Sequence, residues 1–218
     1  MNNSLDIELI VIATTKTGES SLVIHTISKE FGRRSFITSV GKNSRMSMFL
    51  PLNIIHGKIN INSKSTLSRI SGIQSAFPLN SIRSNLDKNT ITLFISEVLY
   101  RSIKDGSNED MLYEWCKSKI LELDALENDY ASFHLLFLME LCEILGFRPT
   151  LESLTPFAGR YFENISDLLT LNKAEFLLYP LNGKNRNEIA EVLLEYLSYH
   201  LDCHLNIHSL KVLRELYA

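Results

Sequence analysis

The sequence from Phe31 to Pro51 is FGRRSFITSVGKNSRMSMFLP. It lies within a longer segment, Phe31 to Leu86, that contains no Asp or Glu, although about six acidic residues would be expected at the average composition of the chain. The bases alternate with apolar, strand-forming residues, so we predict a folded β surface of one charge sign, typical of a polyanion site. Eight basic residues occur in the segment: Arg33, Arg34, Lys42, Arg45, Lys58, Lys64, Arg69 and Arg83.

The residues around this stretch show the period of two that is characteristic of β-strands. Alternating apolar and polar positions predict five strands, separated by turn signals such as Thr17-Gly18. In the fourth strand we expect Pro51 at an edge or a bulge and a bend at Gly57. Five short strands with this spacing predict a closed or nearly closed barrel of the OB-fold type. The predicted strands are 5–14, 21–27, 34–40, 49–61 and 67–73.

After a polar segment at 76–89, the apolar period changes from 2 to 3.6, which predicts helices. Residues 133–145 are apolar on nearly every side, so they should form the central helix of a bundle, with Gly146 at its end. The segment 147–165 is expected to be the least regular. A capping box of Asn185 and Glu188 is predicted to begin a long helix. Other helices are predicted at about 91–103, 109–126, 166–171, 173–178 and 207–217.

Charge is divided unevenly along the chain, although the formal net charge is only −3. Residues 1–80 carry nine Lys/Arg and four Asp/Glu, a net +5, whereas residues 81–218 carry thirteen and twenty-one, a net −8. We therefore predict an α+β protein with an OB-fold DNA-binding domain at 1–80 and an all-α helical domain at 81–218, which serves packing and protein partners.

Cysteine usage and hydropathy indicate the compartment. The three cysteines are an odd number without CxxC spacing, and Cys116 and Cys142 lie in apolar helical patterns, where a free thiol acts as a small buried hydrophobe. This usage fits a reducing cytosol. No apolar run approaches the ~20 residues that span a bilayer, so we expect a soluble, cytoplasmic protein with no membrane partner.

A metal site and an enzyme are the competing chemical interpretations. His200, His204 and His208 would share one face of a continuous helix and could ligate zinc with Cys203. However, Asn206 is expected to break that helix, and no carboxylate or second cysteine pair completes the set, so helix-end packing is preferred. The chain also lacks P-loop, GxGxxG and GxSxG motifs. We predict no catalytic residue, no metal site and no cofactor.

The basic barrel is the strongest candidate site. Because Phe36 is interpreted as core and the acid-free segment has no Tyr or Trp, binding should depend on phosphate contacts, with weak sequence specificity and strong salt dependence. Two alternatives stay open. The basic residues could form only a solvated strand face, or the protein could be a scaffold whose barrel docks an acidic protein partner. The residues predicted to bind nucleic acid are Arg33, Arg34, Lys42 and Arg45, with Lys16 and Lys58 as further candidates.

A succession of short motifs resembles the RecO family of recombination mediators, and the closing segments are most similar to its Bacteroidetes branch. The similarity follows the whole chain in order, and the succession is more specific than any one motif. The motifs are Leu22-Val23-Ile24-His25-Thr26, Glu30-Phe31-Gly32-Arg33, Gly41-Lys42, Ser44-Arg45, Leu50-Pro51-Leu52, Leu93 to Leu99, Phe133 to Leu138, Leu145-Gly146-Phe147-Arg148-Pro149, His200-Leu201 and His208 to Leu213.

The resemblance implies an OB-fold followed by helices, and a non-enzymatic role in DNA repair. Such proteins bind single- and double-stranded DNA and anneal complementary strands. With RecR they help load RecA onto DNA covered by single-stranded-DNA-binding protein, so the expected location is the bacterial cytoplasm at the nucleoid. Many members carry a zinc-binding cysteine segment after the Leu-Gly-Phe-x-Pro motif, but residues 151–162 contain no Cys, so we do not extend zinc binding to this chain.

Overall fold

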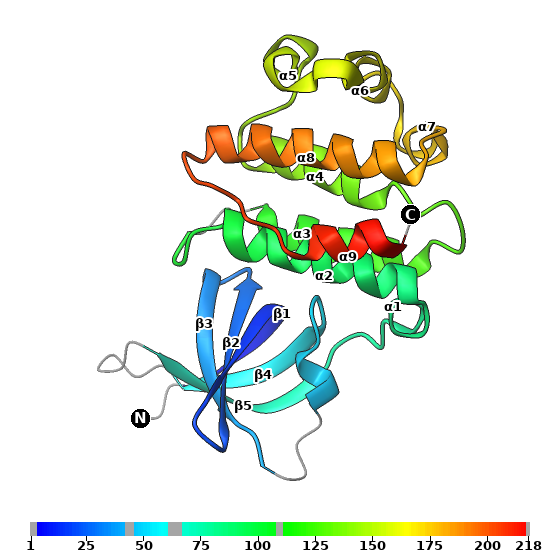
Figure 1. The fold of residues 1–218 in the computed structure, drawn as a ribbon. Helices are drawn as coiled ribbons and strands as arrows, with labels where there is room; N and C mark the ends of the chain where they lie inside the picture. Colours follow the sequence, from blue (N-terminus) through cyan, green and yellow to red (C-terminus); the bar gives the residue numbers. More distant parts are fainter. Residues whose placement is uncertain (1–3, 42–45, 61–66, 108–110, 217–218) are drawn as a thin grey trace. The chain divides into compact units, whose positions relative to one another are not determined.

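The computed structural model describes residues 4–41, 46–60, 67–107 and 111–216 (Figure 1). Five strands close into a barrel in the order β1-β2-β3-β5-β4, with β1 paired to β4. The β3–β5 pair is parallel and the other pairs are antiparallel, which confirms the predicted five-stranded OB-type barrel. The strands are β1 (Ser4–Thr17), β2 (Ser21–Ser28), β3 (Gly32–Ser39), β4 (Ile54–Asn60) and β5 (Ser68–Ser75).

Alternate residues of the strands fill the interior of the barrel. Phe36 is fully buried at the centre of this core, as the sequence predicted. Gly57 faces the same interior, because a Cβ there would lie 2.6 Å from Cδ1 of Ile70, and the pairing of β4 with β5 shifts register beside it. The buried core cluster is Ile7, Leu9, Val11, Leu22, Ile24, Phe36, Phe49, Ile55, Ile59 and Ile70.

The prediction of a strand from 49 to 61 was wrong at its start. A 3-10 helix, η1 (Met46–Phe49), precedes β4, and a turn separates the two elements. Pro51 has no N–H to offer a strand pair, and Leu52 adopts a positive φ of 60°. The side-chain amide of Asn53 donates to the carbonyls of Ser47 (2.7 Å) and Met48 (3.2 Å). These local bonds hold the turn, so the strand begins only at Ile54, although backbone hydrogen bonds to Val11 of β1 already occur at Leu52 and Asn53.

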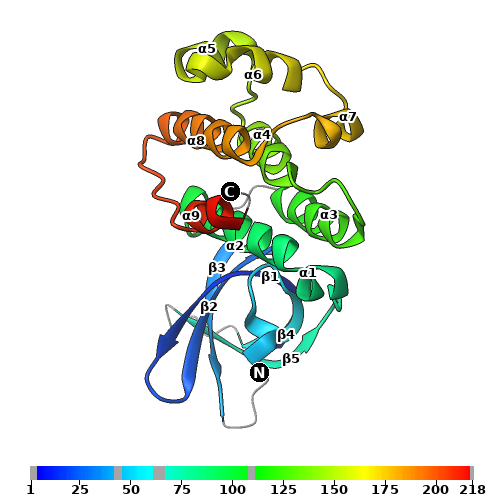
Figure 2. The ribbon, with the colours of Figure 1, turned by 45° about the vertical axis from the view of Figure 1, so that its right-hand side comes forward.

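Helices form the rest of the described chain, as predicted, and α8 lies along α4 in both views (Figures 1 and 2). None of the helices within the described ranges is long and apolar enough to cross a membrane. The helical elements are α1 (Asn80–Ser84), α2 (Leu86–Ser102), α3 (Leu112–Ala125), α4 (Phe133–Ile144), α5 (Leu151–Ala158), η2 (Gly159–Tyr161), α6 (Phe162–Leu168), α7 (Lys173–Leu178), α8 (Gly183–His200) and α9 (Ser209–Leu216).

Two expectations for the helices were wrong. The segment 147–165 is mostly helical, because Thr150 and Ser153 form a capping box that begins α5. The predicted cap at Asn185 lies inside α8, whose N-cap is Asn182, with its side-chain oxygen accepting from the backbone N–H of Asn185 at 2.8 Å. By contrast, α4 ends as predicted, with Gly146 at φ 87°.

Contacts divide the chain into two compact units that do not follow the chain order. The first unit comprises residues 1–80 and 99–121, and the second comprises 81–98 and 122–218. The unit boundary therefore falls within α2 and within α3, so the two ends of each of these helices belong to different units. The barrel is grouped with helical segments that the sequence analysis assigned to the second domain.

Candidate nucleic-acid interface

Arg33 lies at the start of β3 and contacts the chain just after α2, within the same compact unit. Its Nη1 donates to the carbonyl of Ile103, and its guanidinium lies 4.7 Å from the ring centroid of Tyr100. Its backbone N–H also donates to the carbonyl of Ser107 at 3.0 Å. Arg33 is thus held against protein atoms. A phosphate that bound this guanidinium would have to compete with the Ile103 carbonyl.

Arg34 is directed to the other side of β3, because neighbouring strand residues alternate. Its guanidinium lies 4.9 Å from the ring centroid of Phe31, which packs edge-on against Phe36 at 6.4 Å. The side chain is half-buried, and none of the ion pairs among the described residues includes it. Its charge is therefore available to a polyanion at the edge of the core.

Lys42 and Arg45 lie outside the described residues. The last described residue before them is Gly41, which follows the end of β3 at Ser39. Seven residue steps of about 3.3 Å put the start of β3 roughly 23 Å from its end. Arg33 and Arg34 therefore belong to one end of β3, whereas Lys42 and Arg45 follow the other end in the sequence.

Arg69 is a basic residue that the sequence analysis counted but did not assign to the site. It lies on β5, where the parallel pairing places it beside Ile37 of β3. The side chain is exposed, and its Nη1 donates to Oγ of Ser39 at 2.7 Å. Arg69 therefore stands at the end of β3 that Lys42 and Arg45 follow in the sequence. Its only signal in the sequence is its place in the acid-free segment, because this pairing joins distant parts of the chain.

The other basic candidates on the barrel are also exposed. Lys16 lies near the end of β1, and Lys58 lies on β4 with its ammonium 3.9 Å from Asp6. Both members of that pair are largely solvent-exposed, and such pairs contribute little to stability. A phosphate could therefore replace Asp6 as the partner of Lys58 at small cost.

Glu8 is a carboxylate on β1 whose charge is offset by groups of α3 and β4. It accepts hydrogen bonds from the Tyr113 hydroxyl and from the Lys117 ammonium at 2.5 Å, and His56 lies 3.3 Å away. Burial by itself would raise the pKa of Glu8, but the bonds from Lys117 and Tyr113 outweigh it and lower the pKa. Because these groups neutralise Glu8, its charge does little to oppose a polyanion on the barrel.

The histidines near the end of α8 do not share one helix. His200 is the last residue of α8, whereas His204 and His208 precede α9. The His200 ring stacks on Phe147 with centroids 5.0 Å apart. No group of three metal-ligating side chains occurs among the residues that the structure describes.

Both the barrel and helices that follow it match known protein-family models. Residues 1–78 match the family model "Recombination protein O N terminal", and residues 83–154 match "Recombination protein O C terminal". The chain is 30% identical to the DNA repair protein RecO of Bacteroides fragilis, over 95% of this chain and 97% of that protein. The chain belongs to the RecO family. The resemblance seen in the sequence motifs is thereby confirmed.

Other RecO proteins match over a similar length. Identity is 28% with the DNA repair protein RecO of Flavobacterium psychrophilum and 26% with that of Phocaeicola vulgatus, in each case over 96% of this chain and 97% of the relative. The RecO similarity therefore includes both the barrel and the helices. The division of roles between residues 1–80 and 81–218 stays a prediction, as do the four nucleic-acid-binding residues.

Proposed function

We propose that this RecO-family chain acts in DNA repair as a recombination mediator with no catalytic step of its own. Its barrel binds single- and double-stranded DNA through phosphate contacts and anneals complementary strands. Together with RecR it helps load RecA onto DNA covered by single-stranded-DNA-binding protein, in the cytoplasm at the nucleoid. The proposed DNA contacts are Arg34, Lys42, Arg45 and Arg69, with Arg33 in a mainly structural role.

The observation that carries this proposal is the placement of Arg69 beside the end of β3. The pairing of β3 with β5 puts the exposed guanidinium of Arg69 beside the end of β3, the end that Lys42 and Arg45 follow in the sequence. No acidic residue occurs anywhere between Phe31 and Leu86. A basic strand end, followed in the sequence by two further basic residues, suits a sugar–phosphate backbone, which carries regularly spaced charges and needs no base readout.

A non-catalytic role is supported by the state of the buried thiols. Burial raises the pKa of Cys116 and raises that of Cys142 to about 12. Because the thiolate is the nucleophilic form, neither residue suits covalent catalysis. The acidic composition of residues 81–218, a net −8, should repel DNA and suits protein partners such as RecR.

The test is fluorescence anisotropy of the full chain with labelled oligo-dT across a series of salt concentrations. Arg69→Glu and Arg34→Glu should each weaken binding to oligo-dT and to duplexes of unrelated sequence. Each lost phosphate contact should also reduce the slope of log affinity against log salt by about 0.7 for a single strand. A strand-annealing assay with the same variants should show a parallel loss of rate.

The matched control is Lys211→Glu, which makes the same charge change at an exposed position of α9. Its affinity for oligo-dT should stay close to that of the unsubstituted chain. If Arg69→Glu and Lys211→Glu weaken binding equally, the barrel surface is not the site. If the chain does not bind DNA even at low salt, the DNA proposal is wrong and a scaffold that docks an acidic protein is favoured.

A further inference from the structure

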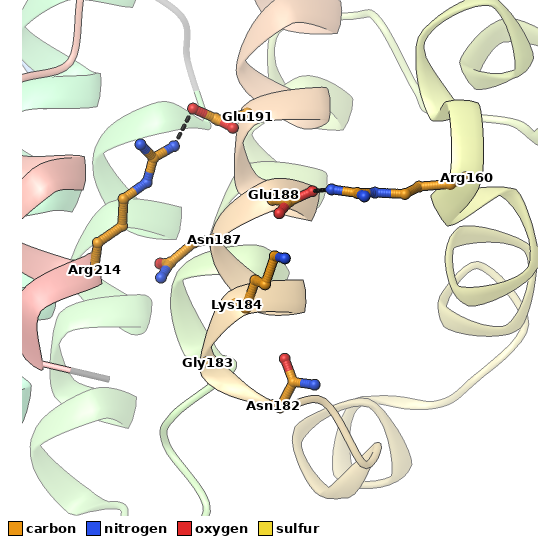
Figure 3. Close-up of a pocket in the computed structure, with 8 residues that line it drawn as sticks. All are labelled: Arg160, Asn182, Gly183, Lys184, Asn187, Glu188, Glu191 and Arg214. Atoms are coloured by element: carbon orange, nitrogen blue, oxygen red, sulfur yellow. Dashed lines mark hydrogen bonds and ion pairs between the residues drawn. The ribbon is translucent and has the colours of Figure 1, made fainter. Parts of the chain in front are cut away.

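A pocket of about 730 Å³ lies at the start of α8, far in sequence from the barrel residues and wholly within the second compact unit. Four side chains of one face of α8 line it, together with an arginine from η2 and another from α9 (Figure 3). The volume is in the range of small-molecule sites. The lining residues are Arg160, Asn182, Gly183, Lys184, Asn187, Glu188, Glu191 and Arg214.

The pocket is lined by three basic and two acidic side chains, a surplus of one positive charge. Glu188 binds Arg160 and accepts from the Tyr161 hydroxyl at 2.6 Å, and Glu191 binds Arg214. Figure 3 shows these pairs on either side of the pocket. Lys184 is exposed and makes no ion pair within the part of the chain that the structure describes. Because two arginines neutralise the two glutamates, the surplus charge is that of Lys184, which favours an anionic ligand.

The start of α8 adds hydrogen-bond donors to this charge. The first backbone N–H groups of a helix have no partners within it. The side chain of Asn182 satisfies the N–H of Asn185, so those of Gly183 and Lys184 are left for a ligand. The helix dipole also favours negative charge at this end, and together these features suit a phosphate group.

Asn187 supplies an independent indication of a ligand. Its side chain is 6% exposed, lines the pocket, and its Oδ1 has no hydrogen-bond partner in the described structure. Figure 3 shows it projecting from α8 toward Arg214. Leaving a buried acceptor without a partner is unfavourable. A ligand that offers an O–H or N–H donor would satisfy it.

We propose that this pocket binds a phosphomonoester whose neighbouring sugar carries a hydroxyl donor, as in a nucleoside monophosphate or the 5′-phosphorylated end of an RNA strand, whose 2′-hydroxyl is free. The phosphate lies at the N–H groups of Gly183 and Lys184 and beside the Lys184 ammonium. The hydroxyl donates to Oδ1 of Asn187. Gly183 and Asn187 are one helical turn apart, about 6 Å along the axis, a separation that a ribose can bridge.

The test is titration of the full chain with AMP, inorganic phosphate and adenosine, followed by calorimetry and by the amide resonance of Gly183. AMP should bind more tightly than either fragment, because only AMP offers both the phosphate and the sugar hydroxyl. Lys184→Ala should weaken AMP binding about fivefold, the size of one lost charge-assisted hydrogen bond at an exposed position. Asn187→Asp should weaken it as well, through repulsion of the phosphate.

Lys211→Ala is the matched control, because Lys211 is also an exposed lysine of the second unit but does not line the pocket. Melting curves check that Asn187→Asp still folds, and the exposed Lys184 variant decides the result if it does not. A 5′-phosphorylated RNA tetranucleotide and its unphosphorylated form separate the two sources. Tighter binding of AMP identifies a free nucleotide, and tighter binding of the phosphorylated RNA identifies a strand end.

Three results would overturn the proposal. The first is no change in the Gly183 resonance at millimolar concentrations of any of these ligands. The second is AMP affinity that Lys184→Ala and Lys211→Ala leave equally unaffected. The third is equal affinity for AMP and inorganic phosphate, which would mean that no donor reaches Asn187. None of these results depends on DNA binding by the barrel.

Discussion

Arg33 and Arg34 are neighbours in β3, yet their surroundings differ because strand side chains alternate between faces. Arg33 donates to the Ile103 carbonyl and covers Tyr100, whereas Arg34 lies over Phe31 at the edge of the core. A double substitution of the pair would therefore mix a packing effect with a charge effect. The two residues need separate tests.

Arg33→Ala should lower the free energy of unfolding by about 1–3 kcal/mol, because the Ile103 carbonyl and the Tyr100 ring both lose their partner. Arg69→Ala should change it by no more than about 0.5 kcal/mol, since Arg69 is exposed. Urea denaturation followed by circular dichroism measures both values. Unchanged stability in Arg33→Ala would show that this guanidinium is not needed for packing.

His134 is fully buried in α4, 5.7 Å from the Phe94 ring. Burial, followed by the charge of Arg186, lowers the pKa of His134 to about 3. Below the ordinary histidine pKa near 6.5, the unfolded chain therefore takes up a proton that the folded chain excludes. The free energy of unfolding is therefore unaffected by this proton above pH 6.5, and it decreases as the pH falls from 6.5 toward 3.

Between pH 7 and pH 5, this residue should lower the free energy of unfolding by about 2 kcal/mol. His134→Leu removes the titrating group and should reduce the difference between the two pH values by that amount. Urea denaturation of both proteins at pH 7 and pH 5 gives the comparison. Equal pH dependence in the two proteins would mean that His134 takes up its proton in the folded state.

At the scale of elements, Glu8 joins β1 to α3. Lys117 and Tyr113 both lie on α3 and donate to the same carboxylate oxygen. Because the pKa of Glu8 is lowered, the charged form is favoured in the fold. The stabilisation is present above the ordinary glutamate pKa and is lost as the pH falls through the lowered one.

Glu8→Gln should lower the free energy of unfolding by about 1 kcal/mol at pH 7, because the ion pair with Lys117 is lost at a partly exposed position. The difference from the unsubstituted chain should shrink as the pH falls below the ordinary glutamate pKa and through the lowered pKa of Glu8, where Glu8 is itself protonated. Asp6→Asn on the same strand is the control, since the Asp6 side chain is 82% exposed. If both variants behave alike, Glu8 does not hold α3.

Several elements could be predicted because their determinants are local. The alternation of residues 21–27 and the apolar run of 133–145 suffice to indicate β2 and α4. The start of β4 could not be found this way, because its hydrophobic residues continue through a turn that is held by Asn53. The segment 147–165 contains proline and glycine but is helical, since Thr150 caps α5 and Pro156 is accommodated within it.

At the scale of the whole molecule, the uneven charge is the property that links sequence to proposed function. A net +5 in residues 1–80 attracts a polyanion, and a net −8 in residues 81–218 repels it. Membership of the RecO family covers nearly the whole chain. The basic segment, the barrel and the family were all predictable, but the individual contacts were not.

The sequence by itself determined the five strands, most of the helices, the family and the acid-free segment, because periodicity, composition and motif order are properties of neighbouring residues. Only the tertiary structure decided which bases are engaged. In the fold, Arg33 donates to the Ile103 carbonyl, and Arg69 lies near the end of β3. The fold also gathers Arg160, Lys184 and Arg214 around one pocket. These groupings depend on pairing and packing between distant segments, which no local pattern specifies.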